Sequence, residues 1–255
     1  MIKKIHQFLK PWYVIILLFI LWWVVSVLEI WNTYLLPTPW KVGATFLKML
    51  QKGEIFEAIL VSFKRVLTGF FISFALAFFM GMLSAYLPGH AAYLKHVSNF
   101  LRNVPPLSMI SLLILWFGLG ETSKLIIIVL ASFFPMTMNI SKGFVECDRR
   151  LIEVGKSMGF SRWKLFFRIS LPYAKEDILV GMRIGLGYSW RALIGAEMFA
   201  AASGLGHMIV FAQQMSRSDK VLIGIFLIGI IGCVCDKLFS VFIRKVCVGG
   251  EKNGS

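Results

Sequence analysis

The chain has 255 residues, of which 58% are apolar and only 16% are Asp, Glu, Lys or Arg. Soluble globular proteins carry about 25% charged residues, so this composition excludes a cytosolic enzyme, a disordered chain and a collagen-like chain, and it predicts an integral membrane protein. The formal net charge of +14 would suggest nucleic-acid binding in a soluble chain, but here it follows from the basic residues that flank apolar spans on the cytoplasmic side.

Apolar stretches in chain order predict six membrane-spanning helices. The first follows a basic tail, and because the residues after it are too bulky for a signal-peptidase site, we expect it to stay attached. The third is short, so it either begins before Pro105-Pro106 or packs inside the protein. The predicted spans are residues 11–28, 66–87, 107–119, 125–141, 178–202 and 221–243.

Two features of the first half predict how its helices are placed. Residues 40–50 form an amphipathic pattern, which predicts a helix that lies on the membrane surface. The second span carries small residues at a strict four-residue spacing, which lets another helix approach closely in lipid. These small residues are Gly69, Ser73, Ala77, Gly81 and Ala85.

The distribution of Lys and Arg predicts the orientation in the membrane. Six spans put both termini on one side, and placing them in the cytoplasm leaves most basic residues inside. We divide the chain into an N-terminal tail with the first span (1–35), an external amphipathic segment (36–65), a five-helix core (66–245) that includes a cytoplasmic loop (142–177), and a C-terminal tail (246–255).

The fifth span contains three charged residues, Arg183, Arg191 and Glu197. A charge at the centre of a membrane helix costs roughly 2.5–3.5 kcal/mol on insertion scales, so such residues usually face protein or a water-filled cavity. Arg191 lies at the centre at neither three nor four residues from the other two, so its partner must come from another segment or from a ligand. Two roles stay open, structural pairing and a place beside the path of an anionic substrate. The candidate path residues are Met109, Ser189, Arg191 and Glu197.

The cytoplasmic loop is predicted to hold two short helices. Asp148 suits the N-cap of the first, apolar residues recur at helical spacing from Leu151, and Gly159 suits the left-handed residue that closes it. Ser161 can cap the second helix, and Pro172 is expected to end it. This hairpin is too short and too charged to span a membrane, so it either docks into a groove on another protein or lies on lipid headgroups.

The same loop resembles the E-A-A…G…I-x-L-P signature of ABC importer permeases, through Glu153, Gly159 and ISLP at 169–172. Val154 and Gly155 replace the two usual alanines, and Val154 adds bulk to the docking face. Further motifs resemble the nitrate/sulfonate/taurine branch of these permeases in order and spacing. They are NVPPL at 103–107, LWFGLGE at 115–121, FFP at 133–135, AEM at 196–198 and SGLG at 203–206.

The resemblance implies an all-α integral membrane protein with six transmembrane helices in the type I ABC importer permease architecture, located in the bacterial plasma (inner) membrane. It implies that the loop docks into an ATP-binding subunit through Glu153, Val154, Gly155, Gly159, Ser161, Leu171 and Pro172. ATP and Mg would then be bound by a dimer of these partner subunits, and we expect no cofactor, metal or catalytic residue in this chain. The sequence GKS at 155–157 lacks the first glycine and the preceding strand of a phosphate loop. The other implied partners are a second permease copy and an extracytoplasmic solute-binding protein.

The predicted function is therefore ATP-driven import of a small anion of the aliphatic sulfonate, taurine or nitrate class, and a neutral heterocyclic vitamin precursor is the alternative substrate. Two other classes of membrane protein are alternatives to an ABC importer permease. An intramembrane serine protease would pair Ser189 with His207, although His207 lies in a predicted outer loop. A secondary transporter or channel would carry internal repeats and paired broken helices, which are not evident in the sequence.

Overall fold

The computed structural model describes residues 13–86, 100 and 103–248, and this part of the chain contains helices and no strands. The long helices are α4 (Glu54–Tyr86), α7 (Glu121–Val145), α10 (Leu171–Ala200) and α12 (Ser218–Val248). The shorter elements are α2 (Tyr13–Val27), α3 (Pro39–Gln51), the 3-10 turn η1 (Pro106–Met109), α6 (Ile110–Phe117), α8 (Arg149–Ser157), α9 (Arg162–Leu165), the π-helical turn η2 (Phe166–Ser170) and α11 (Leu205–Gln214). The basic N-terminal tail, the predicted loop at 88–99 and the last residues of the C-terminal tail lie outside the described residues.

Within the described residues, α4, α7 and α12 are long and apolar enough to cross a membrane on their own. The helical run that includes α10 forms a fourth candidate span together with α11, with a bend of 41° between them. Both α2 and the run from η1 to α6 are apolar but shorter than 18 residues. Each predicted span thus coincides with an observed helix, and the predicted all-α membrane fold is confirmed.

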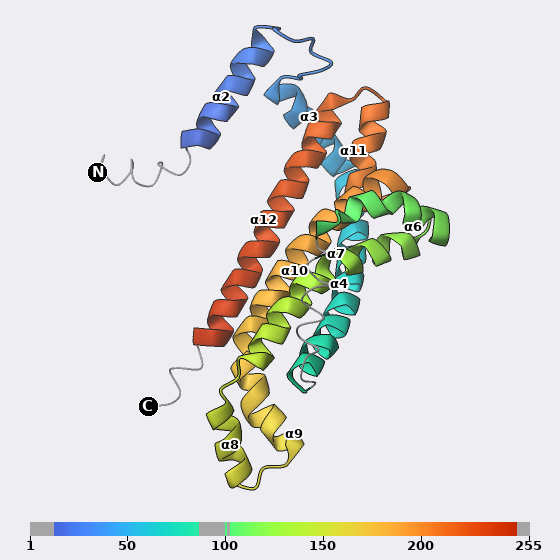
Figure 1. Ribbon diagram of the computed structural model, residues 1–255. Helices are drawn as coiled ribbons and strands as arrows, with labels where there is room; N and C mark the ends of the chain where they lie inside the picture. Colours follow the sequence, from blue (N-terminus) through green and yellow to red (C-terminus); the bar gives the residue numbers. More distant parts are fainter. Residues whose placement is uncertain (1–12, 87–99, 101–102, 249–255) are drawn as a thin grey trace, which may run out of the picture.

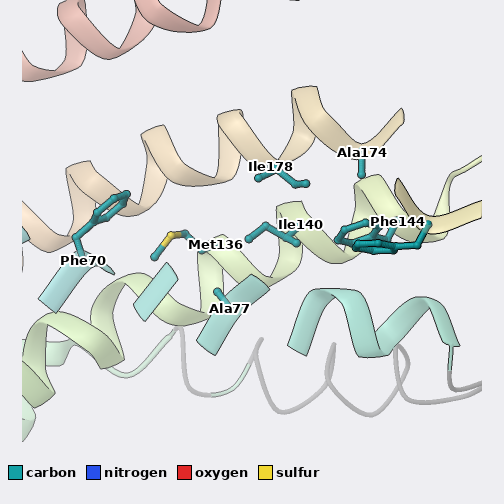
Figure 2. Close-up of a cluster of buried hydrophobic side chains, with 8 residues drawn as sticks. Phe70, Ala77, Met136, Ile140, Phe144, Ala174 and Ile178 are labelled. Atoms are coloured by element: carbon teal, nitrogen blue, oxygen red, sulfur yellow. The ribbon is translucent and has the colours of Figure 1, made fainter. Parts of the chain in front are cut away.

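The core of the bundle is formed by α4, α7 and α10, which pack along much of their length (Figure 1). Apolar side chains from all three helices meet in one buried cluster, shown in Figure 2. In lipid, van der Waals packing between these side chains stabilises the contact between the three helices. The cluster contains Phe70 and Ala77 from α4, Met136, Ile140 and Phe144 from α7, and Ala174 and Ile178 from α10.

The predicted ladder of small residues in α4 lies against α7. A Cβ atom at Gly69 would lie 2.6 Å from Ile128 Cγ2, and a Cβ atom at Gly81 would lie 2.5 Å from Ile140 Cγ2. Between them, the hydroxyl of Ser132 donates a hydrogen bond of 2.8 Å to Ser73 Oγ. Larger residues at the ladder positions would push the two helices apart, so the ladder sets their close approach.

The segment before the second span differs from the predicted division. Thr38 caps α3 by accepting from the Lys41 amide, and α3 buries one face against α12, where the Thr45 hydroxyl donates to Asp219 at 2.7 Å. The predicted amphipathic helix is thus present, but α4 begins at Glu54, twelve residues before the predicted start of the second span. The sequence pattern placed the start too late because residues 54–65 mix charged and apolar residues while still continuing the helix.

The predicted third span corresponds to a short helical run that starts with the 3-10 turn at Pro106. In α6, Ile110 and Leu113 are buried against Ile127 of α7 and Ala192 of α10. Of the two alternatives for this span, packing against the protein is the one that the described residues support. α6 lies over the start of α7, toward the end of the bundle that also carries α3 and α11 (Figure 1).

The prediction that Pro172 ends the second loop helix is wrong. The helical path runs from α9 through the π-helical turn η2 directly into α10, and Pro172 occupies one of the first two positions of α10. Proline is tolerated there because the π-helical turn before it already interrupts the i→i−4 hydrogen-bond ladder of an α-helix. The loop and the fifth span are therefore joined by a continuous helical path.

Candidate functional site

The predicted coupling loop forms a helical hairpin that projects beyond the bundle, at the end opposite to α3 and α11 (Figure 1). The Asp148 side chain accepts from the Arg150 amide at the start of α8, and Ser161 Oγ accepts from the Lys164 amide at the start of α9. Gly159 has a φ of +71°, the left-handed conformation predicted for the residue that closes α8. Each of these local expectations is met by the structure.

The hairpin exposes several large apolar side chains. Val154 is 58% exposed, Met158 is 67% exposed and Trp163 is 74% exposed. A groove of about 340 Å³ runs between α8 and the start of α10. Its lining consists of Leu151, Val154, Gly155, Met158, Phe160, Arg168, Ile169, Pro172 and Tyr173.

Of the remaining predicted loop residues, some are exposed on the hairpin and others pack beneath its surface. Glu153 is exposed, and its carbonyl accepts from the Ser157 hydroxyl. Gly155 is buried, and a Cβ atom there would lie 2.6 Å from a methyl carbon of Leu165, so the glycine lets α8 pack closely on the other arm. Leu171 packs against the buried cluster of Figure 2.

Cys147 marks the junction between α7 and the hairpin. Its side chain is buried, and this burial raises the pKa of the thiol. The thiol therefore stays protonated near neutral pH, and a protonated thiol is a poor nucleophile.

A network of charged groups lies near the other end of the bundle, and sequence reasoning missed its central residue, Arg65. The guanidinium donates from Nε and Nη2 to the two carboxylate oxygens of Glu121, at 2.7 Å each. Its Nη1 donates to Glu197 Oε1 at 2.7 Å and to the Ser203 carbonyl at 2.7 Å. Lys124 also pairs with Glu121, so two cations face two carboxylates and the cluster is neutral.

Glu197 is enclosed completely by this network. Its side chain has no exposed surface, the Ser62 hydroxyl lies 2.8 and 2.9 Å from its two oxygens, and the Gly206 amide donates to Oε2 at 3.0 Å. A buried carboxylate needs such pairing because an unpaired buried charge is costly. The contacts tie α4, α7 and α10 to the turn that precedes α11.

Replacing Gly206, in the first turn of α11, by alanine is expected to destabilise the contact between α11 and α10. The new Cβ atom would lie 2.5 Å from the Ile194 carbonyl and 3.0 Å from the Met198 amide, and backbone atoms cannot move aside without shifting α10. Overpacking of this kind costs about 1–3 kcal/mol. The melting temperature of the detergent-solubilised protein, followed by tryptophan fluorescence, should fall. Gly43→Ala is the matched control, because nothing lies within 4 Å of its added Cβ atom, and an equal loss in both variants would contradict the explanation.

The four predicted path residues do not meet at one point. Glu197 belongs to the network around Arg65, and Met109 packs beside the buried residues Ile110 and Leu113. Ser189 is fully buried, and its hydroxyl has no hydrogen-bond partner among the described residues, so it does not bond to His207 as a protease would require. Arg191 is exposed, and its Nε donates to the Gly187 carbonyl of the same helix at 3.0 Å.

Comparison with known proteins identifies the fold and the family. The family described as "Binding-protein-dependent transport system inner membrane component" matches residues 77–247. A putative aliphatic sulfonates transport permease protein, SsuC of Bacillus subtilis (strain 168), is 34% identical over 226 residues, which are 89% of this chain and 82% of the relative. The taurine transport system permease protein TauC of Escherichia coli (strain K12) is 33% identical over 215 residues, covering 82% of this chain and 78% of TauC.

A solved structure has the same fold. The crystal structure of an amino acid ABC transporter with histidines superposes with a TM-score of 0.62 at 17% identity, covering 78% of this chain and 98% of the other. Fold and comparisons together define a membrane-embedded permease that works with a binding protein and an ATPase partner. The chain belongs to the family of binding-protein-dependent transport system inner membrane components. The family predicted from the sequence motifs is confirmed.

Proposed function

We propose that this chain is the permease subunit of an ATP-driven importer for a small anion of the aliphatic sulfonate, taurine or nitrate class, with an aliphatic sulfonate or taurine as the first candidate. The proposal is supported by relatives named for sulfonate and taurine transport that cover most of the chain. A neutral heterocyclic vitamin precursor is the alternative substrate. The external binding protein selects the solute and delivers it to the permease.

The coupling hairpin is the single observation that carries the mechanism. An exposed apolar face beside a groove suits docking to a protein surface, and the continuous helical path into α10 gives motion of that surface a direct route into the membrane. We propose that Glu153, Val154, Gly159, Ser161 and Pro172 contact the ATPase, while Gly155 and Leu171, which pack inside the protein, hold this surface in place. ATP and Mg bind to the two ATPase subunits, this chain catalyses no reaction, and closure of the ATPases switches the permease between inward-open and outward-open states.

The proposed assembly contains two permease chains around a central path, because six spans suit half of a transport pathway. Both termini lie in the cytoplasm, on the side of the hairpin, as the distribution of Lys and Arg favours. The Arg65 network then lies toward the outer side, where the binding protein docks.

Affinity purification in mild detergent tests this assembly. The tagged chain should retain an ATP-binding subunit and ATPase activity, and proteoliposomes containing the complex and its binding protein should take up labelled taurine or ethanesulfonate. Gly159→Asp is the control, because it places a side chain at a φ of +71° and a negative charge at the C-terminus of α8. This variant should insert normally and lose the ATPase. A stable, ATPase-free wild-type chain would contradict the proposal.

A further inference from the structure

Three arginines lie inside the long core helices, and their surroundings differ. Arg65 is bound by two carboxylates, and Arg183 of α10 donates to both oxygens of Asp236 on α12, at 2.7 Å each. Arg191 has only the carbonyl of Gly187 and the ring of Tyr188, whose centroid lies 5.0 Å from the guanidinium carbon. Among the described residues, no carboxylate pairs with it.

Arg191 borders a cleft of about 410 Å³ between α4, α10 and α12. This volume lies within the range of about 300–1,000 Å³ that is typical of small-molecule sites. The cleft has a largely apolar wall, to which Phe63 and Val66 of α4 and Ile228 of α12 contribute. The Arg183–Asp236 pair lies on its lining nearer to the coupling hairpin and is electrically neutral.

The depth of Arg191 decides which anion can reach it. Arg191 lies about 13 Å along the helix from the end of α10 at Ala200, and Arg183 lies about 12 Å further toward the hairpin. With Ala200 at the outer boundary of a hydrocarbon core about 30 Å thick, Arg191 would lie near the middle of that core. A lipid phosphate and a transported solute share the same anionic oxygen chemistry, but the solute is the one that passes this depth.

We propose that Arg191 is a specificity-determining residue that binds the anionic head of the imported solute within this cleft, while the apolar wall receives its short hydrocarbon part. This inference rests on the proposed function and narrows it, because a neutral heterocycle would leave the Arg191 charge unpaired. A guanidinium suits a sulfonate, since its N–H groups can donate to two oxygens at once.

Cys233 supplies a reporter, since it is exposed and lines the same cleft. In the purified permease–ATPase complex, with Cys147, Cys235 and Cys247 replaced by alanine, Cys233 is reacted with 2-sulfonatoethyl methanethiosulfonate or with the uncharged methyl methanethiosulfonate. The ratio of the anionic to the neutral rate measures attraction of a sulfonate into the cleft. Arg191→Gln should lower this ratio about tenfold, which corresponds to about 1.4 kcal/mol.

The matched control is the double variant Arg183→Gln/Asp236→Asn, which removes the other cleft arginine together with its partner. Its rate ratio should stay within about twofold of wild type, and Arg191→Lys should recover part of the loss by restoring the charge. Ethanesulfonate should slow the neutral reagent in wild type and not in Arg191→Gln.

Four results would overturn the inference. The first is a wild-type Cys233 that does not react with the sulfonate reagent, and the second is an equal fall of the rate ratio in the control variant. The third is a change in the number of permease chains per complex in Arg191→Gln. The fourth is that anionic lipid in nanodiscs, and not ethanesulfonate, protects Cys233 from the reagents. The third result would indicate that Arg191 pairs with a second copy of the chain, and the fourth that a lipid occupies the cleft. If the proposed function itself were wrong, the purified wild-type chain would retain no ATPase, and this result differs from all four results above.

Discussion

Arg65→Met is expected to lower the free energy of unfolding by about 3–5 kcal/mol, because removing one partner of a buried ion pair leaves an uncompensated buried charge. That charge is Glu197, whose side chain has no exposed surface, whereas Glu121 is 58% exposed and keeps Lys124 as a partner. The loss should appear in an unfolding titration of the detergent-solubilised chain with SDS, followed by circular dichroism.

Lys64→Met is the matched control for this prediction, since Lys64 is the exposed basic neighbour of Arg65 on the same helix. It should stay within about 0.5 kcal/mol of wild type, as surface substitutions usually do. The double variant Arg65→Met/Glu197→Gln should recover part of the loss, because it removes the unpaired charge as well. A double variant no more stable than Arg65→Met would show that the cost has another origin.

Arg65 illustrates a long-range relation that apolar patterning did not reveal. Its partners Glu121 and Glu197 lie 56 and 132 residues away in sequence, and no local spacing links them. One signal was present, since Arg65 lies four residues before Gly69 and so continues the ladder of small residues by one step. An arginine on a helix-packing face must be buried against another helix, and extending the ladder would have drawn attention to it.

Local chemistry was predicted better. The caps at Asp148 and Ser161 and the left-handed Gly159 depend on residues a few positions apart, so the sequence contained all that they require. Pro172 was misinterpreted because the sequence does not disclose the π-helical turn that leads into α10. For Arg191, the spacing argument excluded a charged partner on its own helix, and the cleft between three helices became visible only in the fold.

Val154→Glu is expected to abolish uptake and the recovery of the ATPase. Val154 is 58% exposed on the hairpin and lines its groove, so docking of a protein there would bury the new carboxylate. The penalty for burying an unpaired ion is several kcal/mol, and about 2.8 kcal/mol already weakens association 100-fold. Binding of the purified ATPase to the permease in nanodiscs measures this directly. Because the Val154 side chain is largely exposed, the melting temperature of the Val154→Glu permease should differ little from that of wild type.

Lys156→Glu is the matched control for Val154→Glu, since Lys156 is exposed on the same helix and does not line the groove. It introduces the same side chain with a larger change in charge, so an effect of charge alone would be greater in the control. If the face carrying Val154 docks into the ATPase, Lys156→Glu keeps most of its uptake while Val154→Glu loses it. Equal uptake in both variants would indicate that the hairpin lies on lipid headgroups, where apolar contact at Val154 has no protein partner.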